Sequence, residues 1–241
     1  MLMRTRNAIT LGLSFVLPLL AGLDRTAPAI NQIEPWQQVG HQPYELTWTQ
    51  RQQHPETQVE FEDMQGWTLE FHDGAKGELR RSREQQMWGQ HVAKFLYAGT
   101  SDASRVVARP PKPIPIKGDF DSIDLWGYGN RWEFVDDKTT PPAEIAVWLL
   151  DAGGKSHRVL LTAIRWKQWS LIHKRIPDET LRRIALPASI AGIEVAKAAN
   201  AELRYFYCDS LAVYREELKP LSFKPQRSEE HTSELQSRQS I

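Results

Sequence analysis

Aromatic side chains at alternating positions are the groups in this sequence best suited to contact a ligand. In the run 122–128, the alternation of an extended strand separates Trp126 and Tyr128 from the aliphatic residues. In the run 144–150, it separates Trp148 from the aliphatic residues in the same way. Indole and phenol rings stack on the weakly positive C–H faces of sugar rings. We therefore expect Trp126, Tyr128 and Trp148 to share an outer or concave face that contacts such a ligand.

Tryptophan is abundant in this chain, which contains nine, and packed β-strands also bury tryptophan simply as core. We expect Trp67, Trp166 and Trp169 to belong to the core. Trp132 differs from these three because it lies in a largely polar stretch, 130–142, between two apolar runs. It is the fourth candidate for ligand contact.

Motifs of catalysis do not occur in the sequence. It contains no Gly-x-Ser-x-Gly elbow, Walker loop, dinucleotide fingerprint or His-Glu-x-x-His zinc motif. Glycoside hydrolysis needs two carboxyl groups across a cleft, and the proximity of Asp119 and Asp121 in the sequence does not establish that geometry. The single cysteine, Cys208, cannot form an intrachain disulfide and is typical of a small core residue. The sequence therefore favours binding over catalysis.

Short apolar runs with a period of two carry these residues, and Gly, Pro and Asp separate the runs between residues 59 and 214. Residues 151–154, Asp-Ala-Gly-Gly, are typical of a hairpin turn. Only 177–184 has a helical pattern, with acidic residues in its first turn and arginines in its last. The sequence predicts an all-β fold, an antiparallel β-sandwich or jelly roll with one short helix.

Both ends of the chain have features of segments outside the folded domain. Arg4 and Arg6 precede an apolar run, and Ala-Pro-Ala at 27–29 offers the small residues of a cleavage site, which predicts a secretory signal peptide. Residues 227–237 resemble a translated sequencing adapter, so we expect a non-native tail in place of a longer natural chain. The predicted parts are a signal peptide (1–29), an extended lead-in (30–58), a β-sandwich domain (59–218), a linker to a missing downstream region (219–226) and the tail (227–241).

Net charge and the predicted signal peptide limit the classes of partner that we expect. The 30 basic residues balance the 30 acidic ones, which gives no electrostatic reason to expect nucleic acid or an anionic membrane as partner. The signal peptide predicts a secreted or periplasmic protein without membrane attachment after cleavage. The linker predicts a downstream domain of the same chain as a partner.

From residue 61 onward the sequence resembles the galactose-binding-like jelly rolls that serve as carbohydrate-binding modules in secreted bacterial glycoside hydrolases. The matching pieces are FEDMQGW (61–67), PIPIKGDFDSIDLWGYGN (113–130), AEIAVWLLDAGGKSHRVLL (143–161), IRWKQWSLIHKRIP (164–177), IAGIEV (190–195) and RYFYCDSLAVYRE (204–216). Their order and spacing carry the resemblance, which covers most of residues 59–216. The sequence departs from the pattern at Gly127, where a β-branched residue is usual, and in the insertion 130–142.

This resemblance implies a non-catalytic module that binds a poly- or oligosaccharide as part of a secreted, carbohydrate-active protein. It also implies a structural calcium ion between the opening and closing strands, with Glu62, Asp63 and Asp209 at the matching positions. Calcium prefers several oxygen ligands such as carboxylates. Two alternatives stay open: a sandwich that positions a downstream catalytic domain without binding sugar, and ordinary surface carboxylates in place of a calcium site.

Overall fold

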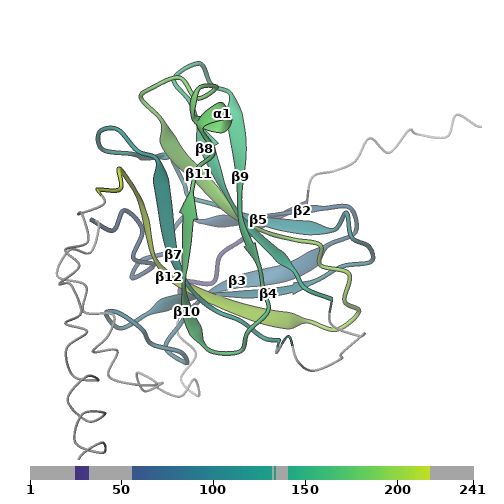
Figure 1. Ribbon diagram of the computed structural model, residues 1–241. Helices are drawn as coiled ribbons and strands as arrows, with labels where there is room; N and C mark the ends of the chain where they lie inside the picture. Colours follow the sequence, from purple (N-terminus) through teal and green to yellow (C-terminus); the bar gives the residue numbers. More distant parts are fainter. Residues whose placement is uncertain (1–24, 33–55, 132, 134–140, 218–241) are drawn as a thin grey trace, which may run out of the picture.

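Two antiparallel β-sheets pack against each other in the computed structural model, which describes residues 25–32, 56–131, 133 and 141–217 (Figure 1). The strands are β1 (Arg25–Pro28), β2 (Thr68–His72), β3 (Lys76–Ser82), β4 (Val92–Ala98), β5 (Arg105–Arg109), β6 (Ile114–Pro115), β7 (Ser122–Tyr128), β8 (Glu144–Leu150), β9 (Ser156–Ala163), β10 (Trp169–Arg175), β11 (Ser189–Ala196) and β12 (Arg204–Tyr214). The predicted all-β sandwich of jelly-roll type is confirmed.

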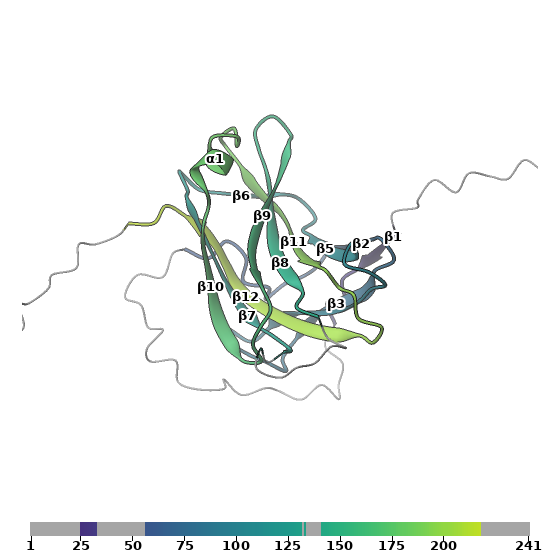
Figure 2. The same cartoon turned by 45° about the vertical axis from the view of Figure 1, so that its right-hand side comes forward.

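The larger sheet has the strand order β1-β2-β5-β11-β8-β9, with β6 beside β11. The smaller sheet has the order β10-β7-β12-β4-β3, and Figure 2 shows β10, β7 and β12 next to one another. From β2 onward the chain passes repeatedly between the two sheets, and from β9 to β12 it changes sheet after every strand. Strands that are neighbours in a sheet are therefore often far apart in the sequence.

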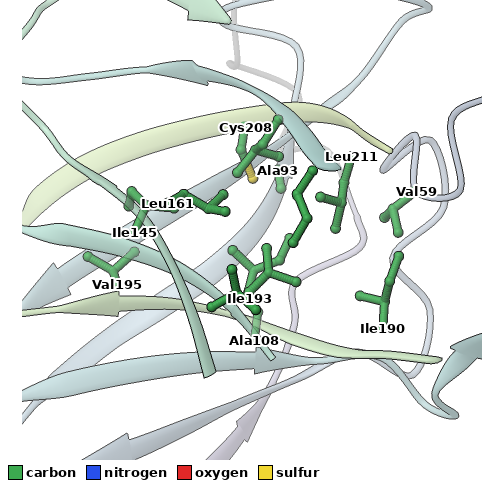
Figure 3. Packing of buried hydrophobic residues seen from close by; sticks show 14 of the residues in the cluster. Val59, Ala93, Ala108, Ile145, Leu161, Ile190, Ile193, Val195, Cys208 and Leu211 are labelled. Atoms are coloured by element: carbon green, nitrogen blue, oxygen red, sulfur yellow. The ribbon is translucent and has the colours of Figure 1, made fainter. Parts of the chain in front are cut away.

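Apolar side chains from both sheets meet in the core between them. Figure 3 shows Ile193 and Val195 of the larger sheet together with Ala93 and Cys208 of the smaller one, and all four are fully buried. The aliphatic residues of β7 and β8 lie in the same cluster, as the alternation predicts. Cys208 is the small core residue that the sequence indicates.

The connections match the predicted turn and helix. Asp151 and Gly154 close the hairpin between β8 and β9 with a hydrogen bond from the Gly154 N–H to the Asp151 carbonyl, at 3.0 Å. Helix α1 (Asp178–Leu181) lies in the predicted helical segment, with Asp178 and Glu179 in its first turn, but it ends before Arg182 and Arg183, which the sequence predicted in its last turn. Figure 1 shows α1 at one end of the sandwich, near β8 and β9.

The N-terminal strand lies where the sequence predicts the end of a signal peptide. Strand β1 is an edge strand that pairs with β2, and Ile30 forms a further bridge with Arg80. A cleavage after Ala29 would remove β1 from the sheet. The cleavage site stays a prediction. No helix in the described parts of the chain is long and apolar enough to cross a membrane.

Candidate functional site

A cavity of about 610 Å³ lies on the outer face of the smaller sheet. Strands β7, β10 and β12 form its floor, and two loops form its rim. Its lining residues are Thr57, Glu60, Glu62, Trp88, Gly89, Gln90, Asp124, Trp126, Leu171, Asp209, Ser210 and Ala212. The cavity therefore combines two indole rings with several carboxyl groups.

The floor of the cavity continues a row of side chains that crosses the sheet. Trp126 of β7 pairs with Leu171 of β10 on one side and with Asp209 of β12 on the other. The next row contains Trp169, Tyr128 and Tyr207, whose rings make edge contacts with centroid separations of 5.8 Å. Together with Trp126, these residues form an aromatic cluster that is separate from the core and lies on the outer face of the sheet.

The loop between β3 and β4, residues 83–91, covers part of this outer face; we call it the Trp88 loop. Met87 is buried in the aromatic cluster. Trp88 is partly exposed and meets Trp126 edge to face, with ring centroids 6.2 Å apart and an interplanar angle of 73°. The cavity thus has one indole from strand β7, Trp126, which is only 4% exposed, and one partly exposed indole from a loop, Trp88.

Glu62 and Asp209 lie at the rim and floor of the cavity, and both accept hydrogen bonds from the Trp88 loop. The Asp209 Oδ2 accepts the N–H of Trp88 at 3.0 Å. The Glu62 Oε1 accepts the N–H groups of Gln90 and His91, at 2.7 and 3.2 Å, and its Oε2 lies 2.7 Å from the Nδ1 of His91.

Burial separates the pKa values of these two carboxyl groups. It raises the pKa of Asp209 to about 8, and the negative charges of Glu62 and Glu60 add to this increase. Burial also favours a higher pKa for Glu62, but the hydrogen bonds from His91 and from the Gln90 N–H outweigh it and hold that pKa below its ordinary value. At neutral pH Glu62 is therefore ionised, whereas Asp209 is largely protonated.

Asp124 is, besides Asp209, the second buried carboxyl group of the cavity, and it is held by side chains of neighbouring strands. Its Oδ1 lies 2.7 Å from the Nδ1 of His173, and its Oδ2 accepts the hydroxyl of Tyr214 at 3.1 Å. Glu60 differs because it is exposed at the rim. The four carboxyl groups therefore occupy distinct environments.

Two residues with strained backbone flank the cavity on separate segments. Phe61, between Glu60 and Glu62, has φ of 56°, and Ser210, next to Asp209, has φ of 48°. Residues other than glycine rarely adopt this left-handed backbone conformation, and such strain is concentrated at functional sites. At Ser210 the register of β12 against β7 also shifts.

The structure divides the four predicted aromatic ligand residues. Trp126 lines the cavity, and Tyr128 packs against the aromatic cluster that contains Trp126 but does not line the cavity. Trp148 lies on the larger sheet, so the prediction that it shares a face with the other two is wrong. Its Nε1 donates to Glu194, and the guanidinium of Arg109 lies over its ring. Trp132 lies outside the described residues.

The expected core tryptophans also divide. Trp67 is buried between the sheets, and Trp166 packs partly exposed against that core. Trp169 is buried, but in the outer aromatic cluster and not between the sheets. The sequence interpretation missed Trp88, although an indole beside Met87 in a polar loop rich in Gln and Arg is a recognisable sign of a contact residue.

The three predicted calcium ligands do not converge. Asp63 turns away from the cavity, where its carboxylate accepts hydrogen bonds from the Asn31 side chain and the Gln65 N–H, both at 2.9 Å. Glu62 and Asp209 bind the Trp88 loop instead. Among the described residues, no group of three or more His, Cys, Asp or Glu side chains is arranged to hold a metal ion. The predicted ligand set does not fit a calcium ion here.

Comparison with known proteins finds no matching family model and no match among curated proteins. Solved structures do match. One is from a study of the promiscuous specificity of carbohydrate-binding modules of the β-sandwich superfamily, with 12% identity and a TM-score of 0.46 over 67% of this chain and 62% of that one. This chain thus spans less than two thirds of the length of that matched protein.

Two further matches are single modules. The family 11 carbohydrate-binding module of a cellulosomal cellulase of Clostridium thermocellum has 13% identity and a TM-score of 0.45, over 70% of this chain and 98% of that one. A family 61 module in complex with β-1,4-galactotriose has 13% identity and a TM-score of 0.41, over 67% and 99%. At these identities the likeness concerns the fold alone.

Proposed function

We propose that this chain is a non-catalytic carbohydrate-binding module and that the cavity on the smaller sheet binds the glycan. The observation that carries the proposal is the pairing of Trp88 with Trp126 in a cavity of about 610 Å³. Cavities of this size accommodate small organic ligands, and two indoles in mutual contact, with carboxyl and other polar groups elsewhere in the lining, suit a pyranose, which has apolar faces and a polar edge.

The charges of the cavity favour an uncharged oligosaccharide over an acidic one. Glu60, Glu62 and Asp124 contribute carboxyl groups, and no Lys, Arg or His is found among the described lining residues. A uronate carboxylate placed there would meet like charges at close range in a partly desolvated site. Neutral glucans, xylans or galactans are therefore the proposed ligand class, and pectate-like chains are disfavoured.

The separated pKa values of Asp209 and Glu62 resemble those of an acid and base pair, yet their contacts support binding without turnover. A general acid must reach the bond that it protonates. Asp209 is only 1% exposed, and both of its oxygens accept backbone N–H groups. Both oxygens of Glu62 contact the Trp88 loop. Both carboxyl groups accept hydrogen bonds from backbone N–H groups of the protein itself.

The wider setting of the module is part of the same proposal. The apolar run after Arg4 and Arg6 supports export, to the outside of the cell or to the periplasm.

The proposed function is tested by calorimetry of the full chain with mixed-linkage β-glucan, xylan, β-1,4-galactan and polygalacturonate. We expect at least one neutral glycan to bind, no binding of polygalacturonate, and no release of reducing ends. Trp88→Ala should weaken binding about tenfold or more, as expected for an anchoring aromatic residue. Trp148→Ala, on the other sheet, is the matched control and should bind like the wild type. Binding by none of the neutral glycans, or loss with Trp148→Ala alone, would contradict the proposal.

A further inference from the structure

The Trp88 loop is attached to the rest of the protein through its backbone. Three backbone contacts fix its C-terminal half: the N–H of Trp88 donates to Asp209, and the N–H groups of Gln90 and His91 donate to Glu62. Asp209 belongs to β12, whereas Glu62 belongs to the segment before β2. Two carboxyl groups from distant parts of the sequence therefore hold one loop.

The geometry around Gly89 shows how closely Glu62 approaches this loop. Gly89 has φ of 61°, which favours glycine. A Cβ atom at this position would lie 1.8 Å from the Glu62 Oε1, so no other residue fits while the carboxylate stays in place. Glu62 thus occupies the space that the missing side chain leaves open, directly beside Trp88.

We propose that Glu62 is a positioning residue for glycan binding: its carboxylate holds the Trp88 loop so that the Trp88 ring stands against Trp126. This inference rests on the proposed function for its effect on affinity, but the attachment of the loop is a separate property. Glu62 acts through Trp88. Its own oxygens are engaged by Gln90 and His91.

Asp63 provides a matched control for this role. It adjoins Glu62 in the sequence, yet its carboxylate bonds to Asn31 and Gln65 and does not line the cavity. Glu62→Ala and Asp63→Ala each remove one carboxylate from the same segment, but only Glu62→Ala removes a contact with the Trp88 loop. Asp209 is less suitable for substitution because it is almost fully buried.

The attachment is tested without any glycan by amide hydrogen exchange in the full chain. We expect Glu62→Ala to accelerate exchange of the Gln90 and His91 amides by about tenfold or more, because each amide loses its hydrogen-bond acceptor. Glu62→Gln keeps an oxygen acceptor and should restore most of the protection. Asp63→Ala should leave both amides at the wild-type rate. Equal exchange in Glu62→Ala and wild type would overturn the proposal.

The role in binding is tested by a double-mutant cycle with the tightest neutral glycan of the calorimetric panel. Glu62→Ala should weaken binding about tenfold in the wild-type background. It should cause no further loss in the Trp88→Ala background, because both changes remove the same contact, that of the Trp88 ring with the glycan. An equal loss in both backgrounds would show that Glu62 acts independently of Trp88 and would overturn the proposal. If no glycan binds, the proposed function fails while the exchange measurement still decides whether Glu62 holds the loop.

Discussion

At the scale of single residues, Asp151 illustrates how one buried carboxylate organises a turn. Its Oδ1 accepts the N–H groups of Gly153 and Lys155, both at 2.9 Å, and its Oδ2 lies 2.8 Å from the Nε2 of His157. The hydrogen bond with His157 is the main cause that lowers the pKa of Asp151 to about 2, and the backbone donors add to it. The ionised carboxylate therefore stabilises the β8–β9 hairpin.

This pKa predicts the pH dependence of stability. Because the folded-state pKa of Asp151 lies below the unfolded value of about 4, its contribution is present above that value and disappears as the pH falls towards 2. Asp151→Asn should lower the melting temperature at pH 7, and its difference from the wild type should shrink between about pH 4 and pH 2. Melting followed by circular dichroism checks this. Exposed Asp102, changed to Asn, should show a much smaller difference, and a constant deficit across the pH range would contradict the expectation.

At the scale of elements, β7 contributes side chains both to the core and to the outer face of the smaller sheet. Its core face contains Gly127, where a Cβ would lie 2.9 Å from Ile172 and 3.0 Å from Phe206. Ile172 and Phe206 therefore fill the space that a β-branched side chain at position 127 would need. Its outer face carries Trp126 into the cavity.

Gly127→Val tests this packing. The larger side chain overpacks the core, so we expect a loss of about 1–3 kcal/mol in the free energy of unfolding, measured by chemical denaturation. The control is Gly127→Val combined with Phe206→Leu, which makes room and should recover part of the loss. A single variant as stable as the wild type would show that the neighbours move aside freely.

The alternation of β7 and β8 was predictable because side-chain direction along a strand is a local property. The sequence does not show which sheet a strand joins. For this reason alternation alone predicts Trp148 beside Trp126, although β8 belongs to the larger sheet. The attachment of the Trp88 loop was equally hidden. It depends on contacts between Glu62, Asp209 and backbone N–H groups more than twenty residues away.

At the scale of the whole molecule, the order of strands follows the predicted runs closely, while the relation between distant segments decides the chemistry. Glu62, Asp63 and Asp209 stand at the positions that the resemblance assigns to calcium, but two of them hold a loop and the third turns away. Calcium binding stays a prediction that only a measurement can test.

The geometry predicts the outcome of that measurement. With Glu62 and Asp209 bound to the Trp88 loop, millimolar calcium or a chelator should leave the melting temperature of the full chain unchanged, since a ligand stabilises only the state to which it binds. Scanning calorimetry with and without calcium checks this, with magnesium as the control ion. A rise with calcium that Asp63→Ala abolishes would restore the calcium site predicted from the sequence.

The backbone attachment of the Trp88 loop also affects how this protein can change. Glu62 and Asp209 recognise N–H groups, which every residue except proline carries. The side chains at 88 and 90 can therefore be exchanged while Glu62, Gly89 and Asp209 keep the loop in place. The loop is a natural position for a randomised library, in which new glycan preferences are selected on an unchanged scaffold.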